Sequence, residues 1–563
     1  MDQGRINLDA SLALLDGLVE VGLKRLVFSP GSRSTPLTLA ALLHEGVEAF
    51  AAVDERSAAW LGLGMARASG CPVALVCTSG TAVANWHPAV VEADRQEVPL
   101  ILLSADRPWE LHHCNANQTI DQVAIFGRHV RSFHQLSAPH ASSDLARRLR
   151  ALGRQLLRES LGPGAGPVHL NFPFREPLVP EKLPPTITAV GRKPLKPGIL
   201  CLEPAELNSL ARELAGGKGV IVCGPGALPV EILELGKACG APVLADPLSG
   251  LRFLSSHRSR PLAAYDLFLR NPTTCQRLQP DWVLHFGGLP VSKTLQNWLS
   301  RNDQKAYWWV NDAGRSLDLP GRRIETLAAN PARLVADLCA ALPSPTSASW
   351  LEEWRKREQQ AQARLERTAL PLEAQLLRTL LDELPDDSLL FLSNSLPVRF
   401  FDACSGTREK TIALHGNRGA SGIDGNLSTL AGLASAWRGS GLAVGVLGDL
   451  AFFHDLNALA LCREQNLLLL LFNNGGGGIF DYLPQHELAL HEQGWRTPVP
   501  MDYQSLAAAF GISCRQLRGQ PDIEPVLAEV LSETGCRLVE IVIDAEASRQ
   551  QYLRLIRQFV EQT

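Results

Sequence analysis

Two short segments in the last third of the chain carry residues suited to bind a metal ion and a phosphate. Gly448-Asp449-Leu450 is followed further along by Asn473-Asn474 and the glycine run 475–478. A carboxylate, an amide oxygen and a backbone carbonyl at glycine are hard oxygen ligands, which suit Mg²⁺ shared with a phosphate. Glycines also let the main chain approach that phosphate closely. The pattern indicates a site for a magnesium-bound diphosphate, and an ordinary buried βαβ unit with a glycine-rich turn is the alternative.

Two strands and a helix between them would position these residues. Apolar runs at 442–447 and 467–472 lead into the Asp and the Asn pair, and apolar residues recur at helical spacing over 455–464. Such crossovers are right-handed and make the two strands parallel. Asp449 and Asn474 should therefore emerge together at the carboxyl ends of neighbouring strands, where open α/β sheets bind ligands.

Length and composition exclude several classes of protein. A chain of 563 residues is too long for one core, and 45% hydrophobic with 20% charged residues is typical of a globular protein. The net charge of −4, without an acidic or basic tail, gives no indication of nucleic acid or an anionic membrane surface. We expect no signal peptide and no membrane span. The 12 cysteines contain no C-x-x-C pair, which favours free thiols and a cytoplasmic location.

The chain predicts three α/β domains with parallel sheets flanked by helices, over residues 1–180, 198–342 and 350–563. Proline-rich linkers at 177–197 and 343–349 separate them, and the charged helix 350–367 should be a solvated connector. Strands are expected at 25–28, 50–52, 73–77, 100–104, 168–172, 219–223, 243–245, 282–286, 306–310, 389–392, 411–414 and 538–543, besides the two named above.

The Asp/Asn unit resembles the diphosphate-anchoring motif of thiamine-diphosphate (ThDP) enzymes, usually written GDG and, later, NN. Leu450 replaces the third residue of the triplet, which leaves the metal-binding Asp in place. ThDP chemistry needs a carboxylic acid that hydrogen-bonds the pyrimidine ring. Glu55 follows a short apolar strand and precedes a helix of small residues at 61–68, and desolvation there would raise its pKa. The alternative is a favourable charge at a helix start.

Motifs along nearly the whole chain are similar to those of one ThDP family, the 2-succinyl-5-enolpyruvyl-6-hydroxy-3-cyclohexene-1-carboxylate (SEPHCHC) synthases of menaquinone and phylloquinone biosynthesis. Ser32-Arg33 within 29–36, Lys293 within 288–293, and Arg418 within 417–425 are the most particular to that family. Other motifs that match are 54–56, 78–82, 104–108 and 117–120.

The resemblance implies a transferase that decarboxylates 2-oxoglutarate with ThDP and Mg²⁺ (Mn²⁺ possible) and adds the succinyl carbanion to isochorismate in a 1,4-addition. It implies Glu55 and Gln118 as catalytic residues and Asp449, Asn474 and the carbonyl of Gly476 as metal ligands. The implied cofactor-binding residues are Glu55, Thr78, Ser79, Gly80, Thr81, Ser395, Gly422, Ile423, Asp424, Gly448, Asp449, Leu450, Asn474, Gly476, Gly478 and Ile479. The implied substrate-binding residues are Ser32, Arg33, Arg107, Asn117, Gln118, Lys293, Ser395, Arg399, Arg418, Ile479, Phe480 and Leu483.

The arginines suit two dicarboxylate substrates because a guanidinium binds planar carboxylates bidentately, although any single Arg can be a structural residue. The family also implies a homodimer or homotetramer with active sites at the subunit interface, small-molecule substrates and no nucleic acid. Gly475 stands where many relatives carry a third Asn. His112-His113 resembles the histidine pair of ThDP decarboxylases, and we interpret it as incidental.

Three other functions remain open. A 2-oxo acid decarboxylase or acetolactate-type synthase on the same fold would need fewer clustered arginines. A protein that binds ThDP without turnover would not depend on Glu55. An NAD-binding oxidoreductase could use Gly224-Pro225-Gly226, but Pro229 stands where a dinucleotide loop has its third glycine.

Overall fold

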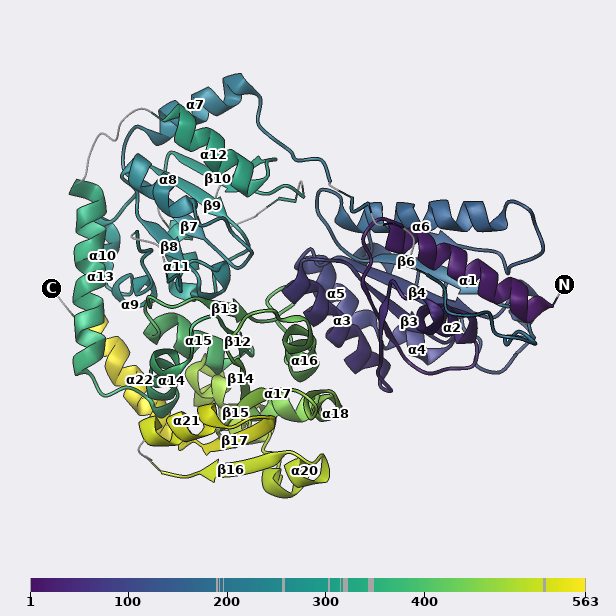
Figure 1. Cartoon of the computed structure of the whole chain (residues 1–563). Helices are drawn as coiled ribbons and strands as arrows, with labels where there is room; N and C mark the ends of the chain where they lie inside the picture. Colours follow the sequence, from purple (N-terminus) through teal and green to yellow (C-terminus); the bar gives the residue numbers. More distant parts are fainter. Residues whose placement is uncertain are drawn as a thin grey trace. The chain divides into compact units, whose positions relative to one another are not determined.

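A computed structural model describes residues 2–188, 191, 193–195, 197–255, 259–301, 304–313, 315–316, 323–342, 349–519 and 523–561. The chain divides into two compact units, each described by itself below (Figure 1). The first unit comprises Met1–Gly198, Asn417–Arg438 and His454–Gln465, and the second comprises Ile199–Gly416, Gly439–Phe453 and Asn466–Thr563. Most of the linker predicted at 343–349 lies outside the described residues.

The first unit is built on a parallel sheet of six strands in the order β2-β1-β3-β4-β6-β5. Its strands are β1 Arg25–Phe28, β2 Glu48–Ala51, β3 Val73–Cys77, β4 Leu100–Asp106, β5 Phe133–Gln135 and β6 Val168–Pro173. Its helices are α1 Gln3–Glu20, α2 Thr35–Leu43, α3 Glu55–Ser69, α4 Thr81–Ala84, α5 His87–Arg95, η1 Trp109–Leu111, η2 Gly127–His129, α6 Leu145–Leu161, α16 Asn426–Ala436, η4 Leu456–Ala458 and α18 Leu459–Cys462.

The second unit contains a parallel five-stranded sheet in the order β11-β10-β9-β7-β8. Its strands are β7 Gly219–Cys223, β8 Val243–Ala245, β9 Trp282–Phe286, β10 Ala306–Val310 and β11 Glu325–Leu327. The helices of this part are α7 Pro204–Leu214, α8 Ile232–Cys239, η3 Pro247–Ser249, α9 Tyr265–Phe268, α10 Pro272–Arg277, α11 Lys293–Arg301, α12 Pro331–Ala341 and α13 Ser349–Arg367.

The second unit also holds a parallel six-stranded sheet in the order β13-β12-β14-β15-β17-β16. Its strands are β12 Ser388–Leu392, β13 Ile412–His415, β14 Ala443–Gly448, β15 Leu467–Asn473, β16 Ser513–Leu517 and β17 Cys536–Val542. The remaining helices are α14 Leu372–Glu383, α15 Leu396–Cys404, α17 Asp449–His454, η5 Gly478–Tyr482, η6 Pro484–Glu487, α19 His491–Gly494, α20 Tyr503–Ala509, α21 Ile523–Ser532 and α22 Ala545–Val560.

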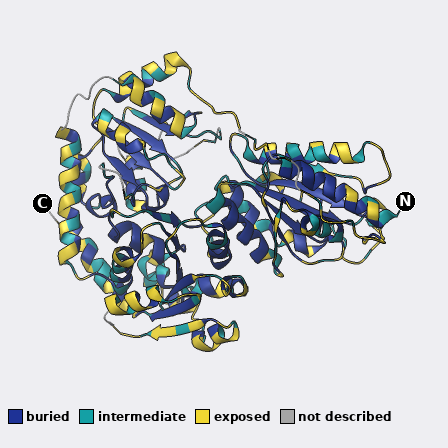
Figure 2. Cartoon of the chain, viewed as in Figure 1, coloured by how far each residue is buried: buried dark blue, intermediate teal, exposed yellow. Residues whose placement is uncertain are grey.

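Three parallel sheets flanked by helices confirm the predicted fold class. The first and third sheets have the same strand order, so both have a point between their first and third strands where the winding direction reverses. Ligands of open α/β sheets bind at such points. Central strands such as β15 are buried on both faces (Figure 2), which explains their continuous apolar runs.

Glycines allow α3 and α16 to pack backbone against backbone within the first unit. A Cβ on Gly64 of α3 would lie 2.1 Å from the Thr429 carbonyl oxygen, and one on Gly432 of α16 would lie 2.0 Å from the Leu61 carbonyl oxygen. No side chain fits at either position. Because α16 directly follows the 417–425 segment, this packing fixes the end of a segment with predicted site residues.

Several predicted elements differ from the structure. The crossover helix expected over 455–464 is present as the 3-10 turn η4 followed by α18, and a separate helix, α17, precedes it. Asp455, just before η4, accepts hydrogen bonds from Ser428. The short, half-exposed strands β5, β11 and β16 were not predicted. The interpretation of 350–367 as a solvated connector is wrong for one face, because Trp350 and Trp354 of α13 are buried in the core.

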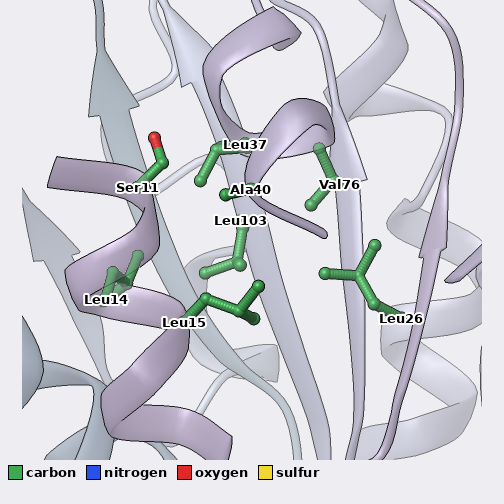
Figure 3. Close-up of a pocket in the computed structure, with 8 residues that line it drawn as sticks. All are labelled: Ser11, Leu14, Leu15, Leu26, Leu37, Ala40, Val76 and Leu103. Atoms are coloured by element: carbon green, nitrogen blue, oxygen red, sulfur yellow. The ribbon is translucent and has the colours of Figure 1, made fainter. Parts of the chain in front are cut away.

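The core of the first unit contains a small void. A void of about 10 Å³ lies between α1, α2 and the sheet (Figure 3), and Leu14, Leu37 and Leu103 are among the side chains that line it. A void of this size holds at most one water molecule, so it belongs to the core. Among the described residues, no helix combines the length and apolar character that a membrane crossing requires.

A fully buried arginine joins the two sheets of the second unit. Arg252 donates to the Ala245 carbonyl at the end of β8 (2.6 Å), to Tyr265 (3.1 Å), and to the carboxylate of Asp402 in α15. Burial raises the pKa of Asp402, and the Arg252 charge acts in the opposite direction. The guanidinium therefore satisfies several buried oxygens at once.

We expect Arg252→Lys to lower the free energy of unfolding by about 2 kcal/mol, because an ammonium cannot replace this set of charged hydrogen bonds. Urea unfolding of the full chain measures the change. The matched control is Arg333→Lys in α12, whose ion pair with Asp337 is exposed and should contribute little. Equal urea midpoints of unfolding for Arg252→Lys and Arg333→Lys would contradict the stabilising role of Arg252.

Candidate functional site

Asp449 lies at the carboxyl end of β14 and is the first residue of α17. Its Oδ2 accepts a hydrogen bond from the Gly476 N–H (2.7 Å), and its Oδ1 accepts one from the Leu450 N–H (2.8 Å). Burial raises the pKa of Asp449, although these backbone hydrogen bonds act in the other direction. A buried carboxylate held by dipoles is stabilised further by a cation, as a divalent metal would provide.

Asn473 and Asn474 differ in whether their side-chain oxygen accepts a hydrogen bond within the described residues. The Asn473 side chain is engaged: its Nδ2 donates to Glu540 (2.7 Å), and its Oδ1 accepts from the Gly475 N–H (3.1 Å). Within the described part of the chain, Asn474 Oδ1 is buried and has no hydrogen-bond partner. An orphaned buried oxygen near a buried carboxylate fits the predicted metal-ligand set.

The glycine run has a backbone that only glycine adopts easily. Gly475, Gly476 and Gly477 have φ values of +77°, +83° and +59°. A Cβ on Gly476 would lie 2.5 Å from the Thr497 carbonyl oxygen, and one on Gly477 would lie 2.1 Å from the Trp495 carbonyl oxygen. The glycines therefore allow a second segment to pack directly on this loop.

Arg496, which was not predicted as a site residue, holds this arrangement together. Its Nη2 donates to the Asn474 carbonyl (2.8 Å), and its Nη1 donates to Oδ2 of Asp481 (2.9 Å). The guanidinium thus connects the proposed ligand Asn474 to η5. The sequence offered no signal for it, because the contact is between a side chain and a distant backbone oxygen.

A similar unusual turn follows one strand in each of the two six-stranded sheets, β3 in the first unit and β12 in the second. Gly80 follows β3 with φ 87° and ψ −144°, and Ser395 follows β12 with φ 75° and ψ −132°. Ser395 is not a glycine, and such backbone strain clusters at functional sites. Arg399 Nη1 donates to the Ser395 carbonyl (2.6 Å), so the structure brings these two predicted residues together.

Other predicted residues of the second unit are more scattered. Lys293 begins α11, and its ammonium lies 3.5 Å from the Gln296 side chain. Ile479 packs against the core, Phe480 is half-buried, and Leu483 is 40% exposed. Leu483 is thus available to line an apolar ligand.

Glu55 lies in the first unit as the first residue of α3, with Asp54 as the N-cap. The helix therefore begins earlier than the predicted 61–68. Glu55 is half-buried in the single chain, and its negative charge adds to the effect of burial in raising the pKa of the Cys77 thiol. Cys77 ends β3, so Glu55 lies close to the loop 78–81 that the sequence assigns to the cofactor.

Two glutamines hold the loop 78–81. Gln118, with φ +54°, donates from Nε2 to the Ser79 carbonyl (2.9 Å). Gln122 is fully buried and accepts a hydrogen bond from the Gly80 N–H (3.0 Å), while its Nε2 donates to Asn171 (2.8 Å). Gln122 was not predicted, because it lies just beyond the recognisable 117–120 motif.

Arg33 and Arg107 form a cationic group beside this loop. Arg33 is buried and donates to the Phe174 carbonyl and to Glu176, both at 2.9 Å. Arg107 donates to Ser79 Oγ and to the Gln118 carbonyl (3.0 Å). Burial lowers the pKa of Arg107, and the nearby Arg33 charge lowers it further. An anionic ligand would relieve this repulsion between like charges.

Three further polar residues, Ser32, Asn117 and His112, are close in sequence to Arg33 or Arg107. Ser32 and Asn117 are exposed in turns. His112 Nε2 lies 3.0 Å from the Arg107 carbonyl and 3.8 Å from Asp106, which places one histidine of the pair next to the proposed substrate arginine. The interpretation of His112-His113 as incidental stays a prediction.

Glu92, on α5, organises the 417–425 segment in the first unit. It is completely buried and accepts hydrogen bonds from the Gly419 N–H (2.8 Å) and the Ala420 N–H (2.5 Å). These contacts fix the backbone at Gly419 and Ala420, which lie in the chain between Arg418 and Gly422-Ile423-Asp424. Ile423 is 37% exposed, which leaves an apolar side chain free to support a ligand. Glu92 was not predicted, because it looks like an ordinary helix charge.

Family profiles match three stretches of the chain. Residues 8–125 match the N-terminal TPP-binding domain of thiamine pyrophosphate enzymes, and residues 410–541 match their C-terminal TPP-binding domain. Residues 204–392 match a profile described as the middle domain of thiamine pyrophosphate. Thiamine pyrophosphate is another name for thiamine diphosphate.

Three relatives that match this chain over nearly their full length are named 2-succinyl-5-enolpyruvyl-6-hydroxy-3-cyclohexene-1-carboxylate synthase. The protein of Dechloromonas aromatica is 40% identical over 96% of this chain and 99% of its own length. The protein of Geobacillus kaustophilus is 38% identical, and that of Listeria innocua is 35% identical, each over 97% of this chain and 96% of its own length.

Proposed function

Since the chain belongs to the SEPHCHC synthase family of thiamine-pyrophosphate enzymes, we propose that it decarboxylates 2-oxoglutarate and adds the succinyl group to isochorismate, giving SEPHCHC and CO2. The reaction is a step of menaquinone or phylloquinone biosynthesis. The cofactor is thiamine diphosphate, and we propose Mg²⁺, with Mn²⁺ as a substitute, as the metal.

The observation that carries the cofactor proposal is the set of oxygens at the end of β14 and β15. Asp449 supplies a buried carboxylate, Asn474 supplies a buried amide oxygen without a partner, and Gly476 supplies a carbonyl from a glycine-only turn. Three hard oxygens suit a divalent cation that also binds the diphosphate. Gly448, Leu450, Gly478 and Ile479 would then line the cofactor.

When bound, thiamine diphosphate supplies a nucleophilic carbon and an electron sink for loss of CO2. Glu55 would hold the proton at a pyrimidine ring nitrogen, and Ile423 would offer the cofactor an apolar contact. The loop Thr78, Ser79, Gly80 and Thr81, with Gly422 and Asp424, would contact it through the main chain. Ser395 and Gln118 would donate hydrogen bonds near the reacting carbon.

The arginines would bind and orient the two dicarboxylate substrates. Burial and the nearby Arg33 charge lower the pKa of Arg107, so an anion bound beside these two residues would offset the repulsion between them. Arg399, Arg418 and Lys293 are the further cations we assign, with Ser32 and Asn117 as uncharged donors and Phe480 and Leu483 as apolar contacts.

We propose that two subunits complete the site, as a homodimer or a homotetramer. Glu55 is half-exposed in the single chain, whereas its proposed task needs an apolar surrounding. Ile423 and Leu483 are likewise exposed apolar side chains that a partner and the cofactor would cover. The cytoplasmic location also remains a proposal, supported by 12 free cysteines.

Arg107→Lys should raise the KM for isochorismate about 10-fold, because an ammonium keeps the charge but loses bidentate binding of a carboxylate. The affinity for thiamine diphosphate should change less than 2-fold (roughly 0.4 kcal/mol). Steady-state kinetics and cofactor titration separate the two effects. The control is Arg175→Lys, which changes an exposed guanidinium paired with Glu110. A larger loss of cofactor affinity than of acceptor affinity would contradict the role.

The proposed reaction is tested by incubating the protein with 2-oxoglutarate, thiamine diphosphate and Mg²⁺, with and without isochorismate. We expect CO2 release to be slow with 2-oxoglutarate alone and to rise when isochorismate is added, with SEPHCHC as product. Fast CO2 release with succinic semialdehyde in the absence of isochorismate would instead identify a 2-oxo acid decarboxylase.

A further inference from the structure

A second group of metal-ligating side chains lies in the segment that follows the glycine loop. Asp481 belongs to η5, His486 to η6, and His491 begins α19. Each offers one ligand atom, and these atoms all lie within 4.8 Å of one another. These three side chains are not among the proposed ligands of the cofactor metal or the proposed substrate-binding residues.

The two oxygens of Asp481 have different surroundings. Oδ2 accepts from Arg496 Nη1 (2.9 Å). Oδ1 lies 2.8 Å from His491 Nε2 and 4.0 Å from His486 Nδ1. One oxygen thus holds a guanidinium, and the other faces two imidazole nitrogens.

Burial and hydrogen bonding leave one of these nitrogens unused. His486 Nδ1 is buried and has no hydrogen-bond partner within the described residues. The side chains of Asp481 and His491 are only 12% and 7% exposed. The His486 side chain is 34% exposed, so the group is reachable from solvent on the His486 side.

We propose that Asp481 Oδ1, His486 Nδ1 and His491 Nε2 form a site for a transition-metal dication such as Zn²⁺, Co²⁺ or Ni²⁺. Bonds of about 2.1 Å in a tetrahedral site place ligand atoms about 3.4 Å apart. The distances from Asp481 Oδ1 to His491 Nε2 (2.8 Å) and to His486 Nδ1 (4.0 Å) lie on either side of that value, and all three ligand atoms lie within 4.8 Å of one another. Shifts of up to about 1.4 Å, within reach of side-chain rotation, would therefore complete the site.

The ligand types determine which cation binds. Two imidazoles and one carboxylate select Zn²⁺, Co²⁺ or Ni²⁺ over Mg²⁺, which prefers oxygen ligands and octahedral geometry. The Arg496 hydrogen bond on Oδ2 orients the carboxylate as an outer-shell partner. Its positive charge also opposes a dication, so the affinity should be weaker than that of a closed structural zinc site.

The test uses the full-length protein, freed of metal with a chelator and then titrated with CoCl2 in excess Mg²⁺. Tetrahedral Co²⁺ with nitrogen ligands absorbs strongly in the visible range, whereas Co²⁺ in an octahedral oxygen site absorbs weakly. We expect the strong bands to saturate at one equivalent. His486→Gln and His491→Gln should each abolish them, with circular dichroism and thermal unfolding used to verify the fold.

His134→Gln is the matched control, because His134 Nε2 lies 2.8 Å from Glu159 in a comparable His–carboxylate pair. This variant should keep the bands. The proposal is overturned if the wild-type protein shows no strong bands, if either His486→Gln or His491→Gln keeps them, or if His134→Gln loses them.

Discussion

Replacing Glu55 with Gln should leave binding of thiamine diphosphate nearly unchanged and lower kcat by roughly 10²–10⁴-fold. An amide has the shape of the acid but cannot share a proton with the pyrimidine nitrogen. Glu55 follows the carboxyl end of β2 and lies near the end of β3, so it can reach a cofactor held by the loop 78–81. Cofactor titration and single-turnover kinetics measure the two quantities separately.

The control for this substitution is Glu48→Gln. Glu48 begins β2, at the strand end opposite to Glu55, and its side chain is 58% exposed. It should keep normal turnover. If Glu55→Gln is as active as the wild type, or if both proteins show the same very low activity, the acid–base role of Glu55 is wrong, and the second outcome would favour a protein that binds the cofactor without turnover.

Asp449→Asn should weaken metal-dependent binding of thiamine diphosphate at least ~10²-fold, because it removes a charged metal ligand. Loss of a direct ligand should lower the metal affinity by more than loss of an outer-shell partner does. In the metal-free protein, burial raises the pKa of Asp449 above its unfolded value. The protonated form therefore stabilises the fold at low pH, and this contribution is lost as the pH rises through the folded pKa.

The raised pKa of Asp449 means that its ionised form is destabilising in the metal-free fold. At neutral pH the variant relieves a buried charge but loses one hydrogen-bond acceptor, so the stability of the metal-free protein should change by no more than about 1 kcal/mol. Cofactor affinity of the wild type should also fall as the pH approaches the raised pKa from above, because the metal competes with a proton.

Calorimetric titration with thiamine diphosphate at fixed Mg²⁺ measures the effect. Asp502→Asn is the control, since Asp502 also accepts hydrogen bonds from backbone N–H groups, as the N-cap of α20, but is exposed. It should bind the cofactor normally. Unaltered affinity in Asp449→Asn would show that the metal ligand is assigned wrongly.

The architecture could be predicted from the sequence where a buried strand is marked by a continuous run of apolar residues. The runs that became β14 and β15 are apolar because both faces of a central parallel strand are covered. The edge strand β16 has no such pattern: it is mostly exposed and contains Arg515 and Gln516. Its strand conformation comes from pairing with β17, a tertiary effect that local composition does not reveal.

The candidate site could be predicted where chemistry restricts residue type, as at Asp449, Asn474 and the glycine run. Residues that position those groups were missed. Glu92, Gln122 and Arg496 each bond to backbone atoms distant in sequence, so neither spacing nor composition marks them. Such contacts become visible only when the fold brings the segments together.

The most direct test of the central claim is a crystal structure of the protein grown with thiamine diphosphate and MgCl2. We predict one Mg²⁺ bound by Asp449, Asn474 and the Gly476 carbonyl together with the cofactor diphosphate, and Glu55 of a neighbouring subunit within hydrogen-bond distance of the pyrimidine ring. A cofactor bound elsewhere, or a metal that leaves Asp449 and Asn474 without contact, would contradict the account.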